Sequence, residues 1–137
     1  MPDLPLEEAP EISEACERHG IALVPLVAPT TPDDRLREIG ARARGFIYTV
    51  SVVGTTGERA GTQDAYSAIL ARVKEFAEVP VAIGFGISTP EQAAAAARAG
   101  ADGVIVGTRL VRAAAESDDP PAAVGELVLG LHAGLIG

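Results

Sequence analysis

Four short apolar segments stand out along the chain. Each is nearly continuous in hydrophobic residues and does not alternate with polar ones, a pattern typical of strands buried on both faces of a parallel sheet. We therefore expect four parallel strands, covered by helices, at Ile21–Val27, Gly45–Val53, Val79–Phe85 and Gly103–Val106.

Helical patterns with clear start and stop signals surround these segments. Thr31 and Thr89 each precede a proline, which predicts an N-cap followed by proline at the first helical position. Gln92, three residues after Thr89, predicts a capping box. Gly20 and Gly100 are typical of the residue just beyond a helix end. The expected helices are Leu6–His19, one beginning after Thr31, Asp64–Phe76, Gln92–Ala99 and Ala122–Leu135.

The repeated strand–helix order implies an α/β fold with right-handed crossovers. A closed eight-stranded βα barrel needs about 250 residues, whereas this chain has 137. We expect a single domain over residues 1–137 that forms half of a TIM (β/α)8 barrel, with about four strands. A half barrel leaves two sheet edges and one sheet face uncovered, so self-association could complete it.

Composition and charge narrow the range of partners. The net charge of −8 disfavours binding to phosphate backbones and anionic lipid, and two Tyr, three Phe and no Trp leave few rings for base stacking. Neither nucleic acid nor a membrane is expected as a partner. The single Cys16 argues against a disulfide framework or a cysteine-rich metal site. With no signal peptide and no long apolar run, we expect a cytoplasmic protein without a metal.

Two expected strand ends are rich in glycine. The segment 84–88 (GFGIS) leads into a capped helix, and Gly107-Thr108 follows the next strand. Glycine lets a backbone approach an anion closely, and amides at a helix start can donate to it. In βα barrels the active site lies at the carboxyl ends of the strands. These adjacent loops therefore favour a phosphate site, with simple tight turns as the alternative.

The same strand ends lack groups for acid–base catalysis. No Asp, Glu or His stands within the last residues of any of the four strands. The only lysine, Lys74, lies in an expected helix, and Asp102 precedes the fourth strand, at the wrong end for catalysis. The loop Gly54–Gly61 is either a mobile lid or a flexible surface loop. We expect binding groups in this chain and no catalytic residues.

In combination, these segments resemble the tryptophan synthase alpha chain. The family cleaves indole-3-glycerol phosphate to indole and glyceraldehyde 3-phosphate in tryptophan biosynthesis, with two carboxylates as general acid and base. The resemblance covers only the C-terminal half of the family's barrel, and both carboxylates belong to the other half. It therefore implies a lyase that is inactive alone. The matching segments are Pro2–Pro5, Leu26–Pro32, Gly45–Tyr48, Gly54–Gly57, Gly84–Gln92 and Val106–Thr108.

The resemblance also implies seven substrate-binding residues. Core packing is the alternative interpretation for Tyr48 and Phe85. Thr108 stands where a serine is more usual, and it keeps the hydroxyl group. The seven are Tyr48 in the indole-glycerol pocket, Thr56 and Gly57 in a mobile loop, Phe85 and Gly86 in the pocket wall and phosphate loop, and Gly107 and Thr108 in a second phosphate loop.

Asp3 and Pro5 match a loop that faces the beta subunit in the family. The resemblance thus implies a tryptophan synthase beta chain as a partner. Pyridoxal phosphate belongs to that beta subunit, and no cofactor is expected in this chain. Three functions remain open: half of a lyase that needs the other half, a module that binds phosphorylated ligands without turnover, and a shortened chain that docks on a beta subunit and regulates it.

Overall fold

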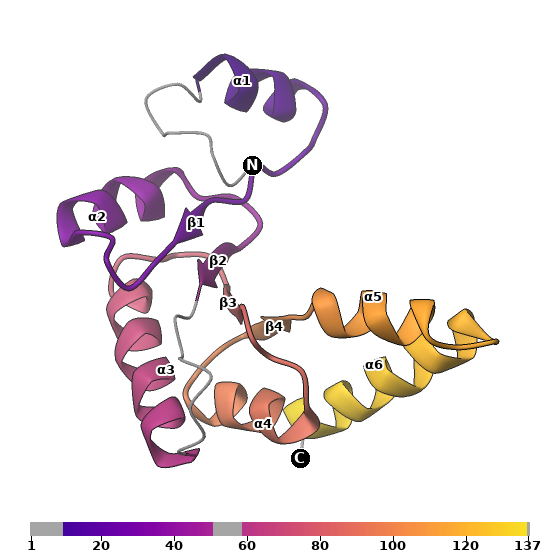
Figure 1. Cartoon of the computed structure of the whole chain (residues 1–137). Helices are drawn as coiled ribbons and strands as arrows, with labels where there is room; N and C mark the ends of the chain where they lie inside the picture. The colour runs from indigo at the N-terminus through magenta and orange to yellow at the C-terminus, as the bar shows by residue number, and fades with distance from the viewer. Residues whose placement is uncertain (1–9, 51–58, 137) are drawn as a thin grey trace.

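The computed structural model describes residues 10–50 and 59–136. In these ranges the chain is α/β, and its four strands form one parallel sheet in the order of the sequence (Figure 1). The expected class and strand number are therefore confirmed. The strands are β1 (Leu26–Val27), β2 (Ile47–Val50), β3 (Val81–Gly84) and β4 (Gly103–Ile105). The helices are α1 (Pro10–Arg18), α2 (Asp33–Arg42), α3 (Arg59–Lys74), α4 (Pro90–Arg98), α5 (Thr108–Ala115) and α6 (Pro120–Ile136).

The strands are shorter than the apolar segments that predicted them. The first was expected from Ile21, but β1 has only two residues. Pro25 has no N–H to donate to a ladder, although its carbonyl still accepts the N–H of Tyr48 at 3.0 Å. At the other end of the sheet, β3 ends before Phe85, whose φ of 78° is incompatible with a strand.

Alternation along each strand gives the sheet two distinct faces. Val27 pairs with Thr49 and Thr49 with Ile83, and all three are buried against the helices. Tyr48 lies on the opposite face, with Gly84 two residues along in register, and is half-buried. The helix-covered face holds the core, which includes Val27, Leu36, Ile39, Ile47, Tyr66, Ile69, Leu70, Val73, Val81, Ile83 and Ala96.

The capping box expected before α4 is confirmed. The Thr89 hydroxyl accepts the N–H of Gln92 at 3.3 Å, and the Gln92 side-chain oxygen accepts the N–H of Thr89 at 3.2 Å. The helix ends as expected at Gly100, whose φ is 98°. There the N–H of Ala101 donates to the carbonyl of Ala96 at 3.0 Å, so a Schellman motif closes α4.

The cap expected at Thr31 is wrong. Its hydroxyl accepts the N–H of Ala28 at 2.9 Å and so stabilises the turn before the helix. Pro32 occupies the N-cap position of α2 without a side-chain hydrogen bond. Arg72 of α3 also stabilises this turn. Its guanidinium donates hydrogen bonds to the Thr31 carbonyl and to the Asp33 carboxylate, the latter at 2.7 Å.

Two helices depart from the sequence expectation. The helix predicted from Asp64 begins five residues earlier, at Arg59, so part of the expected Gly54–Gly61 loop is helical. The helix α5 was not predicted at all. It has only eight residues and no side-chain hydrogen bond at its N-cap, Gly107, so it lacks the signals that marked α4.

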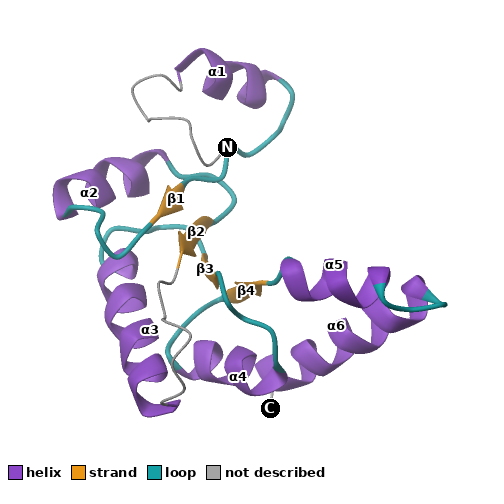
Figure 2. Cartoon of the chain, viewed as in Figure 1, coloured by secondary structure: helices purple, strands orange, loops and turns teal. Residues whose placement is uncertain are grey.

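The last helix, α6, packs against both α4 and α5 (Figure 2). Gly130 and Gly134 face the first residue of α4, and a Cβ atom added at Gly134 would lie 2.3 Å from the Pro90 carbonyl oxygen. The two helices therefore meet backbone to backbone. Figure 2 draws α1 apart from the others, and none of its residues is buried. None of the described helices is long and apolar enough to cross a membrane.

Candidate active site

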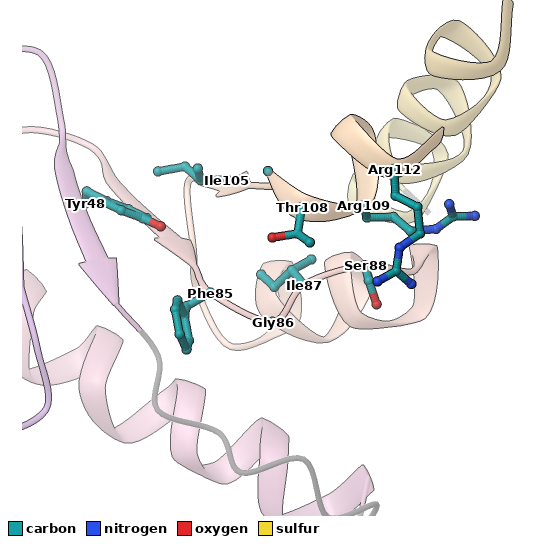
Figure 3. Close-up of a pocket in the computed structure, with 10 residues that line it drawn as sticks. Tyr48, Phe85, Gly86, Ile87, Ser88, Ile105, Thr108, Arg109 and Arg112 are labelled. Atoms are coloured by element: carbon teal, nitrogen blue, oxygen red, sulfur yellow. The ribbon is translucent and has the colours of Figure 1, made fainter. Parts of the chain in front are cut away.

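A pocket of about 540 Å³ opens at the carboxyl ends of β2, β3 and β4 (Figure 3). Its volume is typical of a small-molecule site. Five of the seven expected substrate-binding residues line it together, drawn from elements far apart in the sequence. The lining residues are Tyr48, Phe85, Gly86, Ile87, Ser88, Ile105, Gly107, Thr108, Arg109 and Arg112.

Gly84 makes room for Tyr48 on the pocket side of the sheet. A Cβ atom built on Gly84 would lie 2.5 Å from Cε2 of Tyr48, 2.7 Å from its hydroxyl oxygen and 3.0 Å from Cβ of Ile105. These separations are shorter than van der Waals contact. The Tyr48 ring therefore passes directly over the backbone of β3, and only glycine allows it to lie there.

Two successive residues with positive φ turn the chain from β3 toward α4. Phe85 has φ 78° and Gly86 has φ 83°. Glycine adopts this conformation freely, but a non-glycine residue there is strained by roughly 1 kcal/mol or more. Phe85 is also 67% exposed, so it does not belong to the core of the described residues. Such strain is typical of residues placed for function rather than for packing.

Gln92 fixes the geometry of the loop that follows. Its side-chain oxygen accepts hydrogen bonds from the N–H and the hydroxyl of Ser88 at 2.8 and 3.1 Å, and from the N–H of Thr89. Both donors of Ser88 are therefore already engaged. The amides of Gly86 and Ile87 remain as the donors that this loop could offer to an anion.

The second glycine loop ends at the start of α5. The carbonyl of Gly107 accepts the N–H of Leu110 at 2.9 Å, so Gly107 is the N-cap. The N–H groups of the first helical residues, Thr108 and Arg109, have no acceptor within the helix. The N-terminus of α5 thus lies in the pocket lining, where its dipole favours negative charge, and α4 begins two residues after the lining residue Ser88.

Sequence reasoning missed two cationic residues of the pocket, Arg109 and Arg112. They lie three residues apart on α5 and therefore on one side of it. They carry the only charges among the described lining residues. Their three-residue spacing directly after the Gly107-Thr108 turn is the sequence signal for this pair. It places both arginines on one side only if the segment is helical, and α5 was not predicted.

The four remaining expected site residues are not among those the structure describes. Thr56 and Gly57, and also Asp3 and Pro5, fall outside the described residues. Asp102 lies at the amino end of the sheet, as expected from its place before β4.

Asp102 is tied into the framework of the sheet. Its carboxylate accepts the N–H of Val81 at 2.7 Å and pairs with the Lys74 ammonium at 2.9 Å. Burial raises the pKa of Asp102, but the hydrogen bond from Val81 and the charge of Lys74 together hold that pKa below its ordinary value. These contacts are structural and join α3, β3 and β4.

Comparison with known proteins identifies the family. The family model described as tryptophan synthase alpha chain matches residues 1–129. The chain belongs to the tryptophan synthase alpha family. Among curated members it is 45% identical to the alpha chain of Methanosarcina acetivorans over all of its length and 50% of that protein. It is 44% identical to the alpha chain of Arabidopsis thaliana over 93% of its length and 46% of the relative.

Solved structures of the family agree with this fold. A mutant tryptophan synthase alpha-subunit from Pyrococcus furiosus superimposes with a TM-score of 0.81 at 37% identity, over 97% of this chain and 54% of that one. Tryptophan synthase from M. tuberculosis gives a TM-score of 0.80 at 35% identity, over 98% of this chain and 48% of that one. The chain therefore spans about half the length of the tryptophan synthase alpha relatives it matches.

Proposed function

We propose that this chain forms the phosphate-binding half of an indole-3-glycerol-phosphate lyase site. The observation that carries the proposal is the pocket, where two glycine turns and the N-terminus of α5 converge with Tyr48 and Phe85. The amides and helix dipoles suit a phosphate group, and the rings suit the indole-glycerol portion of the substrate.

Catalysis requires carboxylates from outside this chain. Retro-aldol-like cleavage needs one group to protonate the indole ring and another to remove a hydroxyl proton. No described residue of the pocket lining is an Asp, Glu or His. In the family those carboxylates belong to the other half of the barrel, so the chain binds the phosphate end of the substrate and leaves the chemistry to that half.

Indole release from indole-3-glycerol phosphate tests this proposal. The purified chain alone should release no indole, and a mixture with a separately produced N-terminal half of a family barrel should release it. Release by the chain alone would overturn the assignment of the carboxylates. A mixture without activity, together with a chain that does not bind glycerol 3-phosphate, would overturn the phosphate-binding role.

We also propose that the isolated chain self-associates. Among the described strands, β1 pairs only with β2 and β4 only with β3, so both sheet edges are open. The face opposite the helices carries half-exposed apolar side chains at Leu26, Val50 and Ala82. Burying these groups against a second copy would remove apolar surface from water. Sedimentation velocity should show a dimer or larger species, and a monodisperse monomer would contradict the proposal.

A beta chain is the second proposed partner. The tryptophan synthase from M. tuberculosis and a tryptophan synthase complex from Pyrococcus furiosus are both similar in structure to this chain. The residues expected to face a beta chain, Asp3 and Pro5, lie outside the described part. Co-purification with a separately tagged tryptophan synthase beta chain is the expected result, and its absence at micromolar concentrations would argue against docking.

A further inference from the structure

The anion end of the pocket carries a concentration of positive charge that the family resemblance does not assign. The whole chain has a net charge of −8. In contrast, two of the ten described lining residues are arginines and none is acidic. Figure 3 shows Arg109 and Arg112 reaching from α5 at the end of the pocket where Ser88 lies, away from Tyr48. The charged side chains of the lining are therefore opposite in sign to the net charge of the protein.

The two arginines are available to a ligand. Arg112 contacts Glu116 at 3.9 Å, and both side chains are more than 60% exposed. An exposed ion pair of this kind contributes little to stability, so a better acceptor displaces it easily. Arg109, in the first turn of α5, is also exposed.

A guanidinium group suits a phosphate better than a lone amide does. It presents several N–H donors in a planar fork and keeps its charge at all physiological pH values. Amides and helix dipoles stabilise a single negative charge well, but a phosphate monoester carries close to two at neutral pH. A neighbouring cation stabilises the second charge further, and α5 places two beside its N-terminus.

We propose that Arg109 and Arg112 form a cationic subsite that makes this pocket selective for a doubly charged phosphate monoester. The proposal rests on the proposed phosphate-binding function and adds its charge selectivity. The glycine turns orient the phosphate, and the arginines neutralise its second charge. A singly charged phosphate diester would accept the same hydrogen bonds from the glycine turns, but the arginines would add little to its affinity.

Calorimetric titration of the full 137-residue chain tests the proposal. The two probes are glycerol 3-phosphate, a dianion, and its methyl ester, a monoanion. The test variant is Arg109→Gln with Arg112→Gln. The matched control is Arg42→Gln with Arg98→Gln, which makes the same charge change at exposed residues outside the pocket lining. Circular dichroism verifies that both variants fold.

The unaltered chain should bind glycerol 3-phosphate about tenfold more tightly than the methyl ester. The test variant should lose about tenfold affinity for the dianion and about twofold or less for the monoanion, while the control changes both by about twofold or less. Equal losses in test and control variants, or equal losses for the two probes, would overturn the cationic subsite alone. An unaltered chain that binds neither probe would overturn the phosphate-binding function itself.

Discussion

Gly84→Ala is the sharpest test of how the pocket wall is built. The new Cβ atom would lie 2.5 and 2.7 Å from atoms of Tyr48 and 3.0 Å from Cβ of Ile105. Forcing a methyl group into such a site costs typically about 1–3 kcal/mol. Replacing glycine by alanine within a strand returns roughly 0.5–1 kcal/mol of backbone entropy. The net expectation is a loss of roughly 1 kcal/mol, and at most about 2.5 kcal/mol, in the free energy of unfolding.

Gly103→Ala is the matched control on the neighbouring strand. Gly103 lies on the same face of the sheet, and its added Cβ would meet only the Cβ of Ala82, at 3.9 Å. This is ordinary contact, so the control should gain roughly 0.5–1 kcal/mol. Urea unfolding followed by far-ultraviolet circular dichroism measures both variants.

A double variant identifies the group responsible. In a Tyr48→Ala background the two shortest contacts of the new methyl group disappear, and only the Ile105 contact at 3.0 Å remains. The cost of Gly84→Ala should then fall by about 1 kcal/mol or more, a coupling expected of residues in direct contact. If Gly84→Ala is as harmless as Gly103→Ala, or costs the same with and without Tyr48, the ring does not lie over β3 as described.

Three further substitutions test other parts of the structure. Thr49 is fully buried, and no described group partners its hydroxyl, so Thr49→Val should raise the free energy of unfolding by about 1 kcal/mol. If urea denaturation shows a lower free energy of unfolding instead, the hydroxyl has a hydrogen-bond partner. The lowered pKa of Asp102 means that its ionised form stabilises the fold above the ordinary carboxyl range and that this stabilisation is lost as pH falls. The stability difference between the unaltered chain and Asp102→Asn should therefore shrink between about pH 5 and pH 3, and a constant difference would contradict the assigned ion pair. Gln92→Glu keeps the capping acceptor but adds a negative charge beside the anion site, so it should weaken glycerol 3-phosphate binding in calorimetry with little change in the unfolding transition; unchanged binding would count against an anion in this loop.

Capping and helix-end signals gave correct predictions where the structure depends only on neighbouring residues. The Thr89–Gln92 box and the positive φ of Gly100 are satisfied within one helix and its flanks, and both were predicted from residue type and spacing. Thr31 carries the same signal as Thr89, but its hydroxyl bonds to the preceding turn. Arg72, distant in sequence, holds that turn, and no local pattern could reveal the contact.

The candidate site was predicted in part for the same reason. Glycine turns after two adjacent strands indicate a site because parallel strands bring their carboxyl ends to one edge. Which side chains complete the site depends on packing. The short helix α5 lacks a side-chain cap and is stabilised against α6, so the arginines it carries could not be placed from their sequence alone.

The contact between α6 and its neighbours gives the last helix an architectural role in recognition. It contributes no residue to the described pocket lining, yet it packs on α5, which lines the pocket, and on α4, which begins two residues after the lining residue Ser88. At Gly134 the approach to Pro90 is backbone to backbone, so no side chain can adjust to absorb a shift. The position of α4 relative to α6 is thus fixed by a close contact that lies outside the pocket lining. Under the proposed function, α6 therefore aligns the two loops that would contact the phosphate without contacting the ligand itself.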